Sequence, residues 1–231
     1  MTAYFSRLRL NPTRRGTRTL VGSPQAMHAA VMGSHPGATD SPEGRVLWRL
    51  DRHGGHDLEL FVVSPSRPDF TGIVEQAGWP AAATWDTTEY DRLLRRLVAG
   101  QFWRFGLTAN PVHSVSAARD PSGRGKVLPH VTVAHQGQWL LKNAERWGFD
   151  LPGMTEETAG NIVRGREVAA FGRKAAGVGG STPRRHRVEI TRADYSGVLQ
   201  VTDADRLRSA LVQGMGRAKA YGCGLMTLAP L

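Results

Sequence analysis

The sequence predicts an α+β protein made of two tandem ferredoxin-like domains, and three observations lead to this prediction. The chain has 231 residues, which is enough for two hydrophobic cores of small-domain size. Its first part carries strand and helix patterns in the order strand, helix, strand, strand. A further helix pattern and strand pattern near residue 100 complete or restart that order. We therefore expect one domain over residues 1–97 and a second over residues 98–231.

The first domain is expected to open with a strand and a helix. Side chains over residues 4–10 alternate with a period of two, which is typical of a strand. The basic stretch 13–22 that follows is expected to be a loop. Ser23 followed directly by a proline is a helix start signal, because serine caps the first turn and proline suits its first position. A helix is therefore expected over residues 24–34, and it carries His28.

Two apolar runs predict the next pair of strands. Residues 45–51 and 57–64 each have strand-like patterns, and the segment between them contains two glycines that suit a tight turn. A helix over residues 86–100 and a strand over residues 102–111 follow. RNA-recognition modules share this order of elements.

The second half of the chain is less regular. Its stretch 172–185 is rich in glycine, proline and basic residues, so we expect a mobile loop that a phosphate backbone can order. The other expected elements are a helix at 137–148, a short strand at 167–171, a hairpin at 185–202 that turns at Ser196 and Gly197, and a helix at 203–215 capped by Asp203 or Asp205.

The composition indicates a folded protein that binds a polyanion. Hydrophobic residues make up 40% of the chain and charged residues 22%, which excludes wholesale disorder. The 30 Lys and Arg exceed the 20 Asp and Glu, giving a formal net charge of +10. Basic side chains gain affinity for phosphates by releasing condensed counterions, so RNA, DNA and anionic membranes are all candidate partners. Core packing is expected for Trp48, Trp103 and Trp139, which lie in apolar-periodic segments.

Cysteine usage and hydropathy point to the cytoplasm. Cys223 is the single cysteine, which excludes an internal disulfide and any zinc site built from cysteines. No stretch approaches the roughly 18 apolar residues of a membrane span, and the N-terminus lacks the apolar run of a signal peptide. We expect no membrane association.

The most specific motif is a glycine-rich segment near the C-terminus. Residues 214–224 read GMGRAKAYGCG, in which two Gly-x-Gly pairs are separated by five residues, two of them basic. Glycines permit close backbone approach, so exposed amides can face phosphates while Arg217 and Lys219 add positive charge. A single Gly-x-Gly pair is more often a structural turn, but the repeat of the pair favours a binding loop.

This segment resembles the glycine-rich loop of the repeat-associated RNA-binding superfamily of CRISPR proteins. With the opening FSRLRLNP, the later SPQAMHAAVMGSHPG and the closing AKAYGCGLMTLAP, the chain resembles the CasE family, the CRISPR repeat-processing endoribonucleases of type I-E systems. The resemblance covers both ends and much of the middle in order, and residues 65–160 contribute least to it.

The resemblance implies that His28 is the central catalytic residue, because the family places its key histidine on the first helix. A histidine titrates near neutral pH and can move protons to and from the reacting oxygens of RNA. It also implies a basic hairpin in the second half that contacts the RNA stem. The residues expected to bind RNA are Arg14, Arg15 and Arg18 near His28, Arg173, Lys174, Arg184, Arg185 and Arg187 in the hairpin region, and Gly214, Gly216, Arg217, Lys219, Gly222 and Gly224 in the glycine-rich segment.

The activity implied is cleavage of CRISPR precursor RNA at the 3′ base of the repeat stem-loop. The ribose 2′-hydroxyl would attack the adjacent phosphate and leave a 2′,3′-cyclic phosphate, with no metal and no cofactor. The partners implied are the repeat stem-loop and the other subunits of the type I-E Cascade complex, on which family members stay bound after cleavage.

One departure from the family keeps a second function open. Some members carry a tyrosine one helical turn after the histidine, and this chain has Val31 there. A non-catalytic module that merely holds an RNA hairpin is therefore the alternative. His35 is a further candidate for proton transfer, although a surface position is the simpler expectation for it.

Two other patterns suggest rival chemistry. His53, His56 and Asp57 are possible ligands of a divalent ion, but the glycines between them favour a polar turn, and a fourth ligand is missing. A metal-dependent nuclease built on them is the third reading. The His-x-Thr element at His130 and Thr132 matches half of the two-histidine phosphoesterase signature, and the second half is absent from the sequence.

Overall fold

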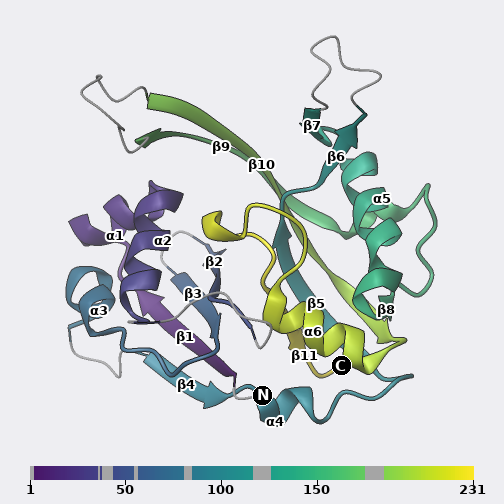
Figure 1. Ribbon diagram of the computed structural model, residues 1–231, viewed down its shortest axis with the longest axis horizontal. Coiled ribbons are helices and arrows are strands. Elements are labelled where there is room, and N and C mark those ends of the chain that lie inside the picture. The colour runs from purple at the N-terminus through teal and green to yellow at the C-terminus, as the bar shows by residue number, and fades with distance from the viewer. Residues whose placement is uncertain are drawn as a thin grey trace.

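The chain folds into two antiparallel sheets that lie side by side, as the computed structural model shows (Figure 1). The structure describes residues 3–35, 37, 44–54, 57–80, 85–116, 126–174 and 185–231, with only the backbone of 172–174 and 185–187. Among these residues, no helix has both the length and the hydropathy needed to cross a membrane.

The first sheet has the strand order of a ferredoxin-like domain, β2-β3-β1-β4, with antiparallel pairing throughout. Its strands are β1 (Tyr4–Leu10), β2 (Leu47–His53), β3 (Asp57–Ser64) and β4 (Trp85–Glu89). The helices of this half are α1 (Arg15–Val21), α2 (Pro24–Gly33), α3 (Thr71–Ala77) and α4 (Asp91–Leu94).

Two predictions for this half were wrong. The basic stretch 13–22 is not a loop, because it contains helix α1. The expected helix over residues 86–100 is strand β4 followed by the single turn of α4. The pairing of β4 with β1 overrides the local helix signal. A 2.9 Å hydrogen bond between the hydroxyls of Ser6 and Thr87 supports this pairing.

The second sheet repeats the ferredoxin-like order. Strand β11 pairs with β5, β5 pairs with β10, and β8 and β9 pair with successive parts of the far edge of β10. The strands are β5 (Phe102–Ala109), β8 (Phe149–Asp150), β9 (Val163–Lys174), β10 (Arg185–Val201) and β11 (Met226–Ala229). A separate ribbon is formed by β6 (Val112–Val115) and β7 (Lys126–Pro129).

The helices of this half are α5 (Val133–Ala144) and α6 (Ala204–Gln213), with 3-10 turns η2 (Glu145–Trp147), η3 (Ala159–Ile162) and η4 (Lys219–Tyr221). Asp203 caps α6 as predicted, since its carboxylate accepts bonds from two backbone amides of the first turn. The predicted hairpin turning at Ser196 and Gly197 was wrong, because both residues lie inside the 17-residue strand β10. The fold class is confirmed.

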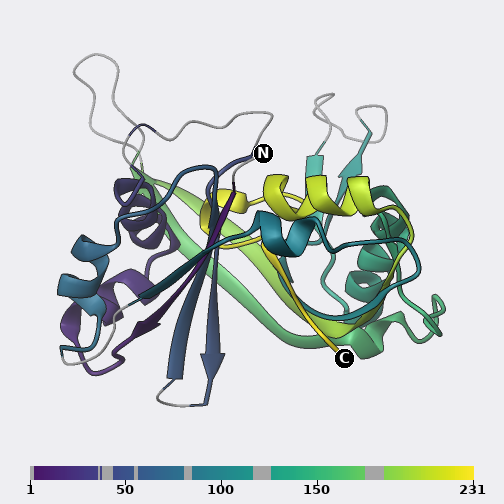
Figure 2. The ribbon, with the colours of Figure 1, turned by 90° about the horizontal axis from the view of Figure 1, so that it is seen from below.

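The core is continuous between the two halves. One cluster joins α1, α2 and α3 to the face of the first sheet that carries Leu8, Leu60 and Val62. A larger cluster contains the helices and strands of the second half together with Leu47 and Val63 from the opposite face of the first sheet. The first sheet is therefore covered on one face by α1, α2 and α3 and on the other mainly by the second half (Figure 2). Trp48, Trp103 and Trp139 are buried as predicted.

Candidate nucleic-acid interface and catalytic site

The helix that carries His28 is built as the sequence predicts. The Ser23 hydroxyl accepts a 3.2 Å hydrogen bond from the Ala26 amide, and Pro24 occupies the first turn of α2. Met27 and Val31 turn into the core, whereas His28, in the middle of α2, is half-buried. Val31 lies three residues after His28 on the same helix and is fully buried. It supplies no polar group beside His28, so the catalytic role of His28 stays a prediction and the module that only holds an RNA hairpin stays the alternative.

The glycine-rich segment packs against this helix, since η4 contacts both α2 and β2. Its four glycines have φ values between 75° and 91°, which disfavour any residue with a side chain. A Cβ at Gly222 would lie 2.7 Å from the Trp48 ring, and one at Gly214 would lie 2.7 Å from Leu47. Packing against the first half thus explains Gly214 and Gly222, whereas Gly216 packs against Trp139 and Gly224 against Met215 within the second half. Their contact with RNA stays a prediction.

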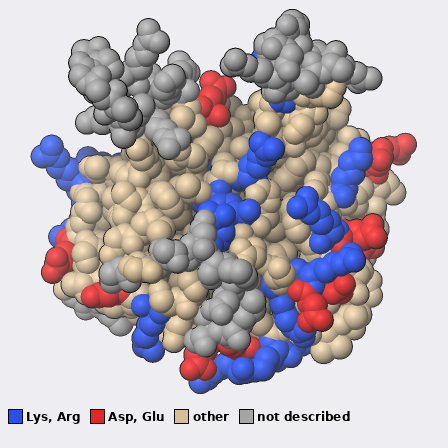
Figure 3. Space-filling model, viewed as in Figure 1, with Lys and Arg blue, Asp and Glu red and all other residues tan. Residues whose placement is uncertain are grey.

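The basic residues of this segment face outward more than its glycines. Arg217 is exposed and its backbone pairs with Asn110, while Lys219 opens η4 and is half-buried. Figure 3 shows Lys and Arg side chains gathered in the middle of this face, over the region of η4. A phosphate backbone that crosses the middle of the molecule would meet positive charge there.

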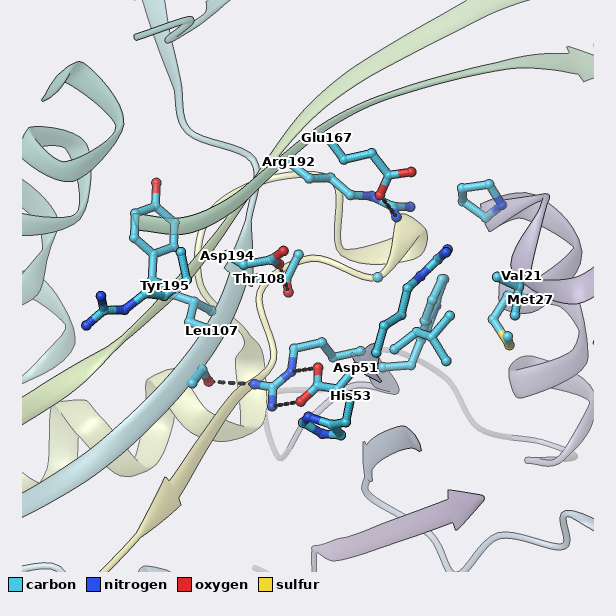
Figure 4. A pocket seen from close by; sticks show the side chains of 18 of the residues that line it. Val21, Met27, Asp51, His53, Leu107, Thr108, Glu167, Arg192, Asp194 and Tyr195 are labelled. Atoms are coloured by element: carbon cyan, nitrogen blue, oxygen red, sulfur yellow. Dashed lines mark hydrogen bonds and ion pairs between the residues drawn. The ribbon is translucent and has the colours of Figure 1, made fainter. Parts of the chain in front are cut away.

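A cleft of about 460 Å³ separates the two halves beside α2. Val21 and Met27 line one wall, Asp51 and His53 lie at one side, and strands β9 and β10 form the opposite wall (Figure 4). The cleft is not a simple basic groove, because the residues of β9 and β10 that line it carry both charges: Arg164, Glu167, Arg192 and Asp194.

The expected RNA-binding residues near α1 differ in their surroundings. Arg14 is half-buried, and its guanidinium donates hydrogen bonds of 3.2 Å and 3.0 Å to the carbonyls of Val74 and Gly78, which ties α1 to α3. Arg15 and Arg18 are exposed on α1. Arg14 therefore has a structural role whatever its contact with RNA, and the predicted RNA contacts of all three residues stay predictions.

The expected residues of the basic hairpin lie on paired strands. Arg185 is paired with Lys174, and Arg187 with Gly172, so the two predicted groups sit opposite one another at the end of the β9–β10 ribbon. Both views show this end reaching over toward α1 and α2 (Figures 1 and 2). Arg184 and the expected loop beyond Lys174 lie outside the described residues. The prediction about these side chains stays untested.

Sequence reasoning missed the residues that join the ribbon to the glycine-rich segment. Arg192 on β10 donates a 2.8 Å hydrogen bond to the Tyr221 carbonyl and lies 3.6 Å from the Glu167 carboxylate. The rings of Phe171 and Tyr221 are 4.9 Å apart. No local pattern marks these contacts, because they depend on the full length of β10.

Structural roles account for His35 and for Thr132 of the His-x-Thr element. His35 is 2% exposed, so the expected surface position was wrong; its Nδ1 lies 2.8 Å from the Val31 carbonyl, and burial lowers its pKa. Thr132 caps α5 by accepting a bond from the His135 amide, which accounts for the threonine of the His-x-Thr element.

The rival metal set is only partly described, because His56 lies outside the described residues. His53 is exposed and sits 3.8 Å from Glu59 across the hairpin. Within the described part of the chain, no cluster of three or more His, Cys, Asp or Glu is arranged to hold a metal ion.

The chain resembles known CRISPR proteins along its whole length. The family model described as CRISPR associated protein matches residues 3–230. The CRISPR-associated endoribonuclease Cse3 of Thermus thermophilus is 26% identical over 228 residues, covering 98% of this chain and 100% of that protein. The CRISPR system Cascade subunit CasE of Escherichia coli is 29% identical over 132 residues, covering 55% and 57%.

The fold agrees with these sequence matches. The structure of Thermus thermophilus Cse3 bound to an RNA that represents a pre-cleavage complex aligns with a TM-score of 0.72 and 25% identity, covering 100% of both chains. Sequence, strand order and solved structures lead to the same conclusion: the chain belongs to the CRISPR associated protein family.

Proposed function

We propose that the protein is a metal-independent endoribonuclease that cuts CRISPR precursor RNA at the 3′ base of the repeat stem-loop. The observation that carries this proposal is the full-length similarity to an endoribonuclease, combined with a half-buried histidine on α2, the helix that η4 of the glycine-rich segment contacts. The basic middle of the same face supports RNA as the substrate (Figure 3).

The proposed chemistry needs only the RNA and protein side chains. The 2′-oxygen attacks the adjacent phosphorus while the bond from phosphorus to the 5′-oxygen breaks, so the products are a 2′,3′-cyclic phosphate and a 5′-hydroxyl. The 2′-hydroxyl must lose a proton and the leaving oxygen must gain one, and His28 is the proposed group for this proton transfer. Positive side chains near the phosphate would stabilise the charge that grows in the transition state.

The stem is proposed to lie against the end of the β9–β10 ribbon. Arg173, Lys174, Arg185 and Arg187 are the proposed contacts there, and their opposed backbone positions support a shared strip of charge. The glycine-rich segment would contact the RNA through Arg217 and Lys219. We further propose that the cleaved RNA stays bound and that the protein joins other Cascade subunits in the cytoplasm.

A module that holds an RNA hairpin without cutting it is the alternative. It would use the same basic face, and it differs from the main proposal only in the role of His28. To distinguish the endoribonuclease from the holding module, both the cleavage rate and the affinity for the hairpin must therefore be measured.

The deciding experiment compares wild type, His28→Ala and His113→Ala on a labelled repeat hairpin in EDTA. His113 is exposed on β6, away from α2, which makes its variant a matched control. We expect His28→Ala to cut about 10²- to 10⁴-fold more slowly with unchanged affinity, because positioned proton transfer contributes a factor of that size. The control should match wild type.

Two outcomes would contradict the proposal. Wild-type protein that binds the hairpin but does not cut it would establish the holding module. Activity that disappears in EDTA and in His53→Ala, but survives in His28→Ala, would favour the metal-dependent reading.

A further inference from the structure

Arg49 on β2 is a buried arginine that joins the two sheets. It is 4% exposed, and its side chain crosses from the first sheet to β5 and β11 of the second. Nε and Nη2 each lie 2.7 Å from one oxygen of the Asp51 carboxylate. Nη1 donates to the Gly106 carbonyl and, over 3.1 Å, to the Leu225 carbonyl, while Nη2 also donates over 2.9 Å to the Thr227 hydroxyl.

These bonds use the full donor capacity of the guanidinium. An arginine has five N–H groups and no acceptor, and five hydrogen bonds are formed here. The cation also lies 5.4 Å from the centre of the Phe61 ring, on the neighbouring strand. Arg49 thus has no N–H left for a phosphate, although it lines the cleft. A role in direct RNA contact is excluded by this arrangement.

The residues next to Arg49 extend the same junction. Leu47 packs beside Gly214, and Trp48 packs beside Gly222, so three consecutive residues of β2 contact the second half. The 3-10 turn η4, between these glycines, contacts α2, the helix that carries His28. A shift of β2 relative to β5 would therefore move α2 relative to the glycine-rich segment and to the β9–β10 ribbon.

We propose that Arg49 is a positioning residue for RNA cleavage, because it fixes the first sheet on the second and so aligns His28 with RNA held by the second half. This inference rests on the proposed function. A misplacement of about 1 Å far from the reacting atoms can cost roughly 100-fold in rate. Lysine keeps the charge at this position but cannot reproduce the planar fork that bridges the two sheets.

The test is a comparison of Arg49→Lys with Arg7→Lys. Arg7 on β1 also pairs with carboxylates, those of Asp86 at 3.0 Å and Glu59 at 3.8 Å, but both partners lie within the first sheet. Single-turnover cleavage at saturating protein and hairpin affinity are measured for both. We expect Arg49→Lys to cut about 100-fold more slowly with affinity within about 3-fold of wild type. Arg7→Lys should keep the wild-type rate.

The pH profile separates positioning from a loss of the catalytic group. In Arg49→Lys the midpoint of the rate profile should stay where wild type has it, while the plateau falls. A wild-type rate in Arg49→Lys would overturn the inference, and so would an equal loss in Arg7→Lys. Failure of wild type to cut would instead overturn the proposed function.

A milder variant covers the case in which Arg49→Lys does not fold. Thr227→Val removes one of the five bonds and keeps the side-chain volume nearly unchanged. We expect it to fold and to cut about 3- to 10-fold more slowly with unchanged affinity. A folded Thr227→Val with the wild-type rate, beside an unfolded Arg49→Lys, would reduce Arg49 to a purely structural residue and overturn the inference.

The displacement can also be measured directly. Cys223 is fully buried, and burial raises the pKa of its thiol to about 12, so it resists labelling. Spin labels at Glu75→Cys on α3 and Glu145→Cys on η2, both exposed, would report the distance between the halves. We expect a shifted or broadened distance distribution in Arg49→Lys. An unchanged distribution beside a slower rate would contradict the proposed mechanism of positioning.

Discussion

At the scale of single residues, His35 shows how burial determines the role of a histidine. A carbonyl can only accept, so the 2.8 Å contact with Val31 places the proton on Nδ1. In the described part of the chain, Nε2 is buried and has no hydrogen-bond partner. Protonation of the ring would create a buried donor without an acceptor, which explains why burial lowers its pKa.

This environment predicts acid sensitivity. The folded protein binds fewer protons at His35 than the unfolded chain does, so its contribution to stability is present above the ordinary pKa of about 6.5 and is lost as pH falls below it. Urea unfolding between pH 7.5 and 5 should give a shallower pH slope for His35→Gln than for wild type. Equal slopes for the two proteins would contradict the prediction.

The sequence predicted the helix that carries His28 because the signals for its start are local. Ser23 and Pro24 identify the start of α2 and so the position of His28 on it. Arg49 has no such signal, since its partners at Gly106, Leu225 and Thr227 are far away in sequence. The exposure of His35 was wrongly predicted for the same reason, because its burial depends on Phe70 from another segment.

At the scale of elements, predictions failed where pairing between strands overrides local preference. Gly197 looks like a turn residue, but in β10 it lies opposite Phe105, whose ring would be 3.3 Å from a Cβ at this position. The glycine permits close packing inside a continuous strand. In β4, polar residues that resemble a helix start are held as a strand, in part by the 3.0 Å ion pair of Arg7 with Asp86.

The glycine-rich segment is an element whose stability can be tested. Gly222→Ala would place a methyl group against the Trp48 ring in a backbone with φ of +80°. Overpacking and the left-handed conformation should together cost about 2–4 kcal/mol in the free energy of unfolding. Gly72→Ala on α3 is the matched control: a Cβ there meets nothing within 4 Å, so we expect a gain of roughly 0.5 kcal/mol. Chemical denaturation measures both, and equal stability of the two variants would refute the packing account.

At the scale of the whole molecule, the shared core predicts that the two halves unfold together. Leu47 and Val63 of the first sheet belong to the same buried cluster as Trp103, Leu140 and Leu211 of the second half. Separating the halves would expose this surface to water, which is unfavourable in proportion to its apolar area. We therefore keep the boundary at residues 97 and 98 as a proposal about topology and not as a division into independent folding units.

Calorimetry checks this prediction. We expect a single thermal transition whose calorimetric and van't Hoff enthalpies agree, as in two-state unfolding. Residues 1–97 expressed alone should lack a cooperative transition. Two resolved transitions in the full chain, or a folded isolated fragment, would show that the halves are independent.

The outer part of the β9–β10 ribbon extends beyond the second sheet, because β10 has 17 residues. Over residues 193–195, β10 lies between β5 and β9, whereas residues 185–192 pair with β9 alone. At about 3.3 Å per residue, that outer part is roughly 25 Å long. Two-stranded ribbons twist more strongly than wide sheets and have no third strand to resist bending. The ribbon is therefore more rigid at residues 193–195 than at residues 185–192. The outer residues can bend to follow the curvature of a bound surface without any change in how the two halves pack.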